Sequence, residues 1–273
     1  MKYSLLVIPV QNPICRKTSN LIQQIVLLIL AVFTFIPAFG QPVRVAVAAN
    51  AQTVVRKIAA DFKNKTGINV EIISGSSGKL AAQIKNGAPY DLFLSADMDF
   101  AQQVYTEGFA LTKPRVYALG SLIVCSATGA SLENWKALIS DQQTGKIAIA
   151  NPALAPYGKA AEQALKHYHL YAALVPRLVF GESISQVNTY VLKKVVNIGF
   201  TTESLVYELK PADHLKWQRI DPATYTPIQQ GALLLHYAKR KNYTENKRFY
   251  DYLFSADAKA VFSQYGYRNY KSN

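Results

Sequence analysis

From residue 41 onward, short apolar runs rich in β-branched residues alternate with segments whose apolar positions recur at helical spacing. The apolar runs predict strands at residues 43–49, 69–74, 91–95, 121–126, 146–150, 177–180, 197–202 and 232–237. The helical spacing predicts helices that include residues 52–66, 77–86, 159–168, 183–194 and 245–265. Strands separated by helices are typical of βαβ units, so we predict an α/β fold with parallel sheets covered by helices on both faces.

Two stretches of this pattern read as crossovers between domains. Residues 114–120 and 221–231 both begin and end in turn-forming or polar residues. They divide the chain into a discontinuous first domain, residues 41–117 with 228–273, and a second domain, residues 118–227. The 233 residues from 41 to 273 can bury roughly 70% of their unfolded surface, which suits one large or two small domains.

The first 40 residues have the features of an export signal. Basic Arg16 and Lys17 precede an apolar run, residues 25–36, which is 12 residues long. A bilayer span takes about 20 such residues, so a signal peptide is favoured over an uncleaved anchor. The small residues Ala38 and Gly40 predict cleavage before Gln41. We therefore expect an exported, periplasmic protein.

Composition narrows the functional classes. The chain is 50% hydrophobic and 17% charged, as in globular proteins, and its 30 basic and 17 acidic residues give a net charge of +13. The basic residues are scattered and the protein is exported, so nucleic acid is an implausible partner. Its two cysteines, Cys15 and Cys125, exclude a disulfide scaffold and a four-cysteine zinc module. Cleavage of the signal would leave Cys125 as the single cysteine of the exported protein, and we expect it to be buried.

One kind of chemistry recurs at four strand-to-helix turns. They have polar or glycine residues and occupy residues 48–51, 74–80, 151–158 and 181–185. Each offers unpaired backbone N–H groups at a helix start, at the edge of the sheet where α/β folds bind ligands. A helix N-terminus carries about half a positive charge, so four that converge would offset roughly two negative charges without lysine or arginine. The turns thus predict a dianion site, although each turn taken alone could be a simple helix cap.

Other motifs do not fit. Gly75 to Lys79 lacks the first glycine of a phosphate loop, because Ile73 stands there, and it is not a G-x-S-x-G turn. His167 and His169 are two residues apart on a predicted helix and point to different faces, which is unsuited to a shared metal. An exported hydrolase with Ser76 or Ser77 as nucleophile stays an alternative. It would need a positioned base, and no histidine is near the four turns in sequence.

Several motifs carry a resemblance to a known family. They are VAVAAN at 45–50, SGSSGKLAAQI at 74–84, GAPYDLFLSAD at 87–97, KIAIANP at 146–152 with APYG at 155–158, and FYDYL at 249–253. Together they resemble the periplasmic molybdate-binding proteins of ABC transporters, over nearly the whole chain after residue 40. The most specific parts are SGSSG and GAPYDLFLSAD.

The resemblance implies the type 2 periplasmic-binding fold, in which two doubly wound α/β domains are joined by a two-stranded hinge and close on a tetrahedral oxyanion. Its binding positions fall on Asn50, Ser77, Tyr157 and Ile184, the last through its backbone N–H. Many members have Ser in place of Asn50 and Ala in place of Tyr157. The Asn50 amide and the Tyr157 backbone N–H can still donate.

Two further residues are weaker candidates. Ser76 lies in the same loop as Ser77, and Thr202 stands where some members use a tyrosine. Molybdenum would be held through the oxygen atoms of the oxyanion, with no direct cation ligand and no cofactor.

The function implied is capture of molybdate, with tungstate also accepted, and delivery to the membrane permease of an ABC importer by a monomer that catalyses nothing. Another dianion such as sulfate is the alternative ligand within the same fold.

Overall fold

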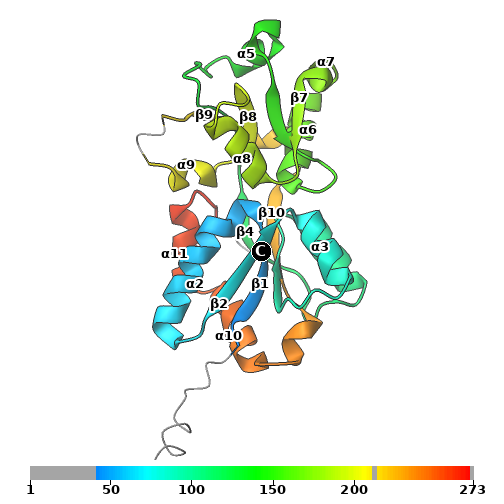
Figure 1. Cartoon of the computed structure of the whole chain (residues 1–273), viewed down its shortest axis with the longest axis vertical. Coiled ribbons are helices and arrows are strands. Elements are labelled where there is room, and N and C mark those ends of the chain that lie inside the picture. The colour runs from blue at the N-terminus through cyan, green and yellow to red at the C-terminus, as the bar shows by residue number, and fades with distance from the viewer. Residues whose placement is uncertain (1–40, 211–213, 271–273) are drawn as a thin grey trace, which may run out of the picture. The chain divides into compact units, whose positions relative to one another are not determined.

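The computed structural model describes residues 41–210 and 214–270, in which ten strands form two mixed five-stranded sheets (Figure 1). The first sheet has the order β2-β1-β3-β10-β4, with β1 (Val43–Ala48), β2 (Val70–Gly75), β3 (Leu92–Leu94), β4 (Arg115–Gly120) and β10 (Ile228–Leu234). The second has the order β7-β6-β8-β5-β9, with β5 (Leu122–Ser126), β6 (Ile147–Ala150), β7 (Leu178–Gly181), β8 (Ile198–Thr202) and β9 (Lys216–Arg219). The predicted signal peptide lies outside the described residues.

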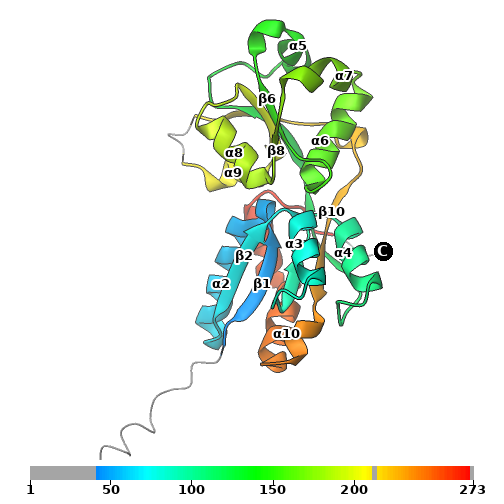
Figure 2. The same cartoon turned by 45° about the vertical axis from the view of Figure 1, so that its right-hand side comes forward.

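Each sheet and its helices form what we call a lobe (Figures 1 and 2). The helices of the first lobe are α2 (Gln52–Thr66), α3 (Ser77–Lys85), α4 (Met98–Thr106), α10 (Tyr243–Tyr252) and α11 (Ala256–Gln264). Those of the second lobe are α5 (Trp135–Ser140), α6 (Pro156–His167), α7 (Tyr171–Leu174), α8 (Ile184–Leu192) and α9 (Ser204–Glu208). Short 3-10 helices are η1 (Ala49–Ala51), η2 (Gln142–Thr144), η3 (Val175–Arg177), η5 (Pro222–Thr224) and η6 (His236–Lys239). Within the described residues, no helix has both the length and the apolar character needed to cross a bilayer.

Burial on both faces explains the apolar runs. In β1, Val45 and Val47 pack with Phe62 of α2, whereas Ala46 on the opposite face packs with Leu80 of α3. Successive strand residues point to opposite faces, so a strand is apolar wherever both faces are covered, as from Val45 to Ala48 in β1. The three inner strands of the second sheet, β5, β6 and β8, are likewise buried, and Cys125 in β5 is fully inaccessible as predicted.

The prediction of parallel sheets is correct in part. β1 pairs in parallel with β2 and β3, and β6 does so with β7 and β8. In contrast, β10 is antiparallel to β3 and β4, and β5 is antiparallel to β8 and β9. The predicted crossover at 114–120 is itself mostly strand. It pairs with the second crossover, as in Ile228↔Gly120.

Some predicted boundaries are wrong for identifiable reasons. The predicted strand 232–237 begins earlier and ends at Leu234, because residues 236–239 form η6. The predicted helix 245–265 is two helices, since the Ser255 side chain accepts a hydrogen bond from the Ala258 N–H and starts α11. Helix α6 begins at Pro156, three residues before the prediction, which is a position proline favours.

Candidate functional site

A small cavity lies where the two lobes meet. It holds about 200 Å³ of space, part of it open to solvent. Its lining residues are Ala48, Ala49, Asn50, Ser76, Ser77, Ala96, Ala155, Pro156, Tyr157 and Ile184. The structure therefore brings together the four residues predicted for the site, together with Ser76. Asn50 and Ser77 come from the first lobe, and Tyr157 and Ile184 come from the second.

Four helix starts contribute to this lining, and none of them has a side-chain cap. The residues that precede η1, α3, α6 and α8 accept no hydrogen bond from the first helical turn, although two of them are Ser76 and Ser183. Helix α4, by comparison, is capped by Asp97, which accepts from the Phe100 N–H. The first N–H groups of a helix have no partner within it, so these four starts leave donors for a ligand. The interpretation of the turns as simple caps is therefore wrong.

Ser77 is oriented by the loop that follows β3. Its hydroxyl is buried and accepts a hydrogen bond from the Ala96 N–H at 2.9 Å. That bond occupies a lone pair and leaves the hydroxyl proton free to be donated. Ser77 thus offers both its backbone N–H and its side chain as donors.

Asn50 is used differently from the prediction. Its side-chain Nδ2 donates to Gln230 Oε1 at 2.8 Å and to the Tyr267 hydroxyl at 3.2 Å. The Tyr267 hydroxyl in turn donates to the Asn50 carbonyl at 2.6 Å. The expectation that the amide of Asn50 is available to an anion is therefore corrected. The amide instead holds the turn in place.

This buried network was missed from the sequence. Tyr117 in β4 also donates to Gln230 Oε1, at 2.9 Å. Burial raises the pKa of Tyr267 to about 12 and that of Tyr117 well above its usual value, so both hydroxyls stay protonated. Asn50 is separated from Gln230 by 180 positions and from Tyr267 by 217. No local pattern in the sequence indicates such contacts.

Tyr157 lines the cavity, and its side chain reaches Thr202 and Gly120. Its buried hydroxyl accepts from Thr202 Oγ1 at 3.1 Å. It also lies against Gly120 at the end of β4, where the Cβ of any larger residue would be 2.0 Å from the hydroxyl oxygen. Thr202 therefore lies behind the cavity and supports Tyr157, rather than lining the cavity itself.

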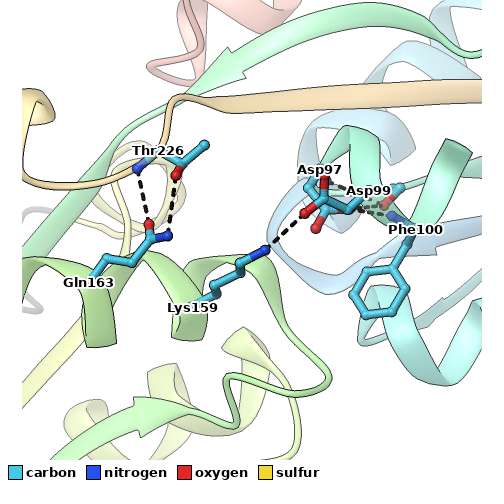
Figure 3. A network of polar contacts seen from close by, with 7 residues as sticks. Asp97, Asp99, Phe100, Lys159, Gln163 and Thr226 are labelled. Carbon is cyan, nitrogen blue, oxygen red and sulfur yellow. Dashed lines mark hydrogen bonds and ion pairs between the residues drawn. The ribbon is translucent and has the colours of Figure 1, made fainter.

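Charged residues surround the cavity but pair with one another. Lys79 contacts Glu182 at 2.7 Å, and Lys159 contacts Asp99 at 2.9 Å (Figure 3). Both pairs join the first lobe to the second. The described residues that line the cavity itself include no lysine, arginine, aspartate or glutamate.

Helix α6 is further tied to the second crossover, and a backbone bond also joins the lobes. The Gln163 amide is paired with Thr226 through two hydrogen bonds (Figure 3). The Gly78 N–H donates to the Leu154 carbonyl at 2.9 Å. The lobes are thus in direct contact around the cavity.

These features suit binding and not acyl transfer. Ser77 Oγ has only the Ala96 N–H as a partner, and Ser76 Oγ has none in the described part of the chain. A serine nucleophile needs an adjacent base, so the geometry gives no support to a hydrolase. The described residues also contain no group of three His, Cys, Asp or Glu side chains that could hold a metal ion.

Known proteins with the same architecture bind solutes. The family model of bacterial extracellular solute-binding proteins matches residues 43–268. The molybdate-binding protein ModA of Azotobacter vinelandii is 34% identical over 226 residues, which cover 82% of this chain and 89% of that protein. ModA of Rhodobacter capsulatus is 34% identical over 233 residues, covering 85% and 90%. The solved periplasmic molybdate-binding protein of Azotobacter vinelandii matches with a TM-score of 0.78 at 30% identity, over 84% of this chain and 100% of that one.

Proposed function

Because this chain belongs to the family of bacterial extracellular solute-binding proteins, and is thus a binding protein and not an enzyme, we propose that its solute is molybdate, with tungstate also accepted. The observation that carries the proposal is the set of four uncapped helix starts around one cavity without charged side chains. The relatives named molybdate-binding proteins support the same choice of ligand.

The electrostatics favour a dianion. Each helix start contributes roughly half a positive charge, so four of them offset about two negative charges. Unpaired lysines would attract any anion over a long range, whereas backbone donors fixed in the fold do not. The site therefore selects for a compact ion whose oxygens accept from several sides.

The contacts we propose are made mainly by the backbone. The N–H groups of Asn50, Ser77, Tyr157 and Ile184 donate to the oxyanion, and the Ser77 hydroxyl adds one side-chain donor. The free proton of Ser77 and the first-turn positions of the other residues support this assignment.

We further propose the cellular context. The segment 1–40 is removed as a signal peptide near Gly40, and the product acts as a periplasmic monomer that delivers its ligand to the permease of an ABC importer. Domain I consists of residues 41–117 with 228–273, and domain II of 118–227. The pairing of β4 with β10, where these segments join, supports that division.

Titration calorimetry with molybdate, tungstate, sulfate and phosphate tests the ligand. Molybdate and tungstate are expected to bind with one ion per chain. Hydrogen phosphate carries a proton that adds a donor to a site rich in donors, and an unpaired buried donor costs about 1–3 kcal/mol. Phosphate should therefore bind about tenfold or more weakly at pH 7. Equal affinities for phosphate and molybdate, or tighter binding of sulfate, would contradict the assignment.

A further inference from the structure

The Ser76 hydroxyl is buried without a partner. Ser76 is 3% exposed, and its Oγ contacts no hydrogen-bond donor or acceptor in the described part of the chain. It occupies the position before α3 with extended backbone, where a serine would normally cap the helix, yet it forms no such bond. Native structures rarely leave a buried hydroxyl without a hydrogen bond, so we expect this atom to have a hydrogen-bond partner outside the chain.

The position of Ser76 indicates what that partner is. Ser76 lines the same cavity as Ser77, Tyr157 and Ile184. The neighbouring Ser77 hydroxyl is already fixed by the Ala96 N–H at 2.9 Å, whereas Ser76 has its proton and its lone pairs free. We propose that the Ser76 hydroxyl is a direct ligand contact, which donates to an oxygen of the bound oxyanion and stays unpaired when the site is empty. This proposal rests on the proposed function of the site.

The proposal gives Ser76→Ala a distinctive pair of effects. In the ligand-free protein the substitution removes an unpaired buried polar atom, so the melting temperature should rise by about 2 °C or more. In the complex it removes a hydrogen bond to a charged group, so molybdate should bind about tenfold or more weakly. A purely structural serine would lose stability and leave affinity intact.

Two other serines serve as matched controls. Ser183 holds the equivalent position before α8 and also forms no cap bond, but it lies in the adjoining groove with Lys79 and Glu182 and not in the cavity. Ser183→Ala should leave molybdate affinity within about twofold, since Ser183 does not line the cavity. Ser255 caps α11 through the Ala258 N–H, so Ser255→Ala should lower the melting temperature without changing affinity.

The experiment combines calorimetry with sodium molybdate and thermal melts of the ligand-free proteins, on the wild type and the three variants. Weaker binding with an unchanged or higher melting temperature, for Ser76→Ala alone, supports the contact. Unchanged affinity overturns it while the proposed function stands, because the wild type still binds. A fall in melting temperature with intact affinity also overturns it and assigns Ser76 a structural role. If the wild type itself shows no heat with molybdate, tungstate or sulfate, the proposed function fails first.

Discussion

The two halves of the cavity are built in different ways. The first lobe contributes Asn50 and two serines, and a buried network of Gln230 and Tyr267 holds Asn50. The second lobe contributes Tyr157 and Ile184, whose side chains are buried in its own core. In the proposed site, one half therefore depends on side-chain donors, whereas the other depends on where the backbone of α6 and α8 lies. Substitutions should reveal this difference, because changing a side chain in the second half leaves its donors in place.

The largest effect is expected from Gly158→Ala, which displaces backbone in the second-lobe half of the cavity. A Cβ at Gly158 would lie 2.1 Å from the carbonyl oxygen of Ala150, and that backbone atom cannot rotate away. The first turn of α6, and with it the Tyr157 N–H, must shift. We expect the free energy of unfolding to fall by about 3 kcal/mol, and molybdate affinity to fall by about a hundredfold. Denaturant unfolding and calorimetry measure the two effects.

Gly75→Ala is the control for this substitution. Gly75 ends β2 close to the cavity, but its Cβ would meet only the Leu80 side chain, at an ordinary 3.4 Å. It should change affinity by less than about threefold, or 0.7 kcal/mol. Similar losses of affinity at both glycines would show that any added atom near the cavity weakens binding. The position of the α6 backbone would then have no particular importance.

A smaller effect is expected for Ser77→Ala in the side-chain half. The variant loses one hydrogen bond to a charged ligand, about 1.5–3 kcal/mol, and leaves the Ala96 N–H without its acceptor. Affinity for molybdate should fall by roughly 10- to 150-fold. Calorimetry beside a melting curve distinguishes this loss from a purely structural one.

The matched substitution in the backbone half is Ile184→Val. It removes a buried methyl(ene) group at about 0.5–1.5 kcal/mol of stability. The backbone N–H is retained, so affinity should stay within about twofold. If affinity instead falls as far as in Ser77→Ala, the distinction between the two halves is wrong.

An effect smaller than that of Ser77→Ala is expected at the ion pairs that join the lobes. Lys159 and Asp99 are each more than half exposed, and such pairs contribute about 0.2–1 kcal/mol. Lys159→Glu should weaken molybdate binding by a few fold at low ionic strength, because it opposes contact between the lobes. The loss should disappear at about 1 M salt, where the screening length is about 3 Å.

The control is Lys65→Glu, which breaks an ion pair with Asp257 inside the first lobe. Calorimetry at low and high salt should show no change in affinity for this variant. An equal response in both variants would mean that the net charge, and not contact between the lobes, determines the effect.

The smallest effect concerns pH and Glu208→Gln. The Glu208 carboxylate accepts from Thr53 at 2.9 Å and from Ser204 at 3.1 Å, and burial raises its pKa above 4.5 despite these bonds. The pKa of such a carboxyl is higher in the folded state than in the unfolded state. The free energy of unfolding therefore falls as the pH rises from the unfolded-state pKa to the folded-state pKa. Relative to Glu208→Gln, the wild type should therefore lose stability over that window, with the difference largest at neutral pH. If the melting temperatures of the two proteins change by the same amount between pH 4 and 7, this prediction is wrong.

The local part of this structure could be predicted from the sequence, and the long-range part could not. Runs such as residues 43–49 and 146–150 are apolar because both faces of their strands are buried, so the pattern identifies them. Strand β9 has four exposed residues, Lys216 to Arg219, and gives no hydrophobic signal. Its pairing with β5 is a tertiary contact that overrides local preference.

The same contrast holds within the cavity. The resemblance placed Asn50, Ser77, Tyr157 and Ile184 together, and the structure brings them to one cavity. It did not indicate that the Asn50 amide is held by Gln230, since their contact depends on how β10 enters the first sheet. The start of a new helix after Ser255 could be predicted from the sequence, because a serine followed two positions later by Asp257 is typical of a helix start.

The position of β10 also constrains when the chain can fold. In the first sheet it lies between β3 and β4, so residues 228–234 must arrive before those two strands can be joined. A ribosome adds about 5–20 residues each second, so this sheet stays incomplete for many seconds of synthesis. Contacts between residues distant in sequence also form slowly once the whole chain is present. The first half of the chain therefore cannot form a finished sheet before its last strand has been made.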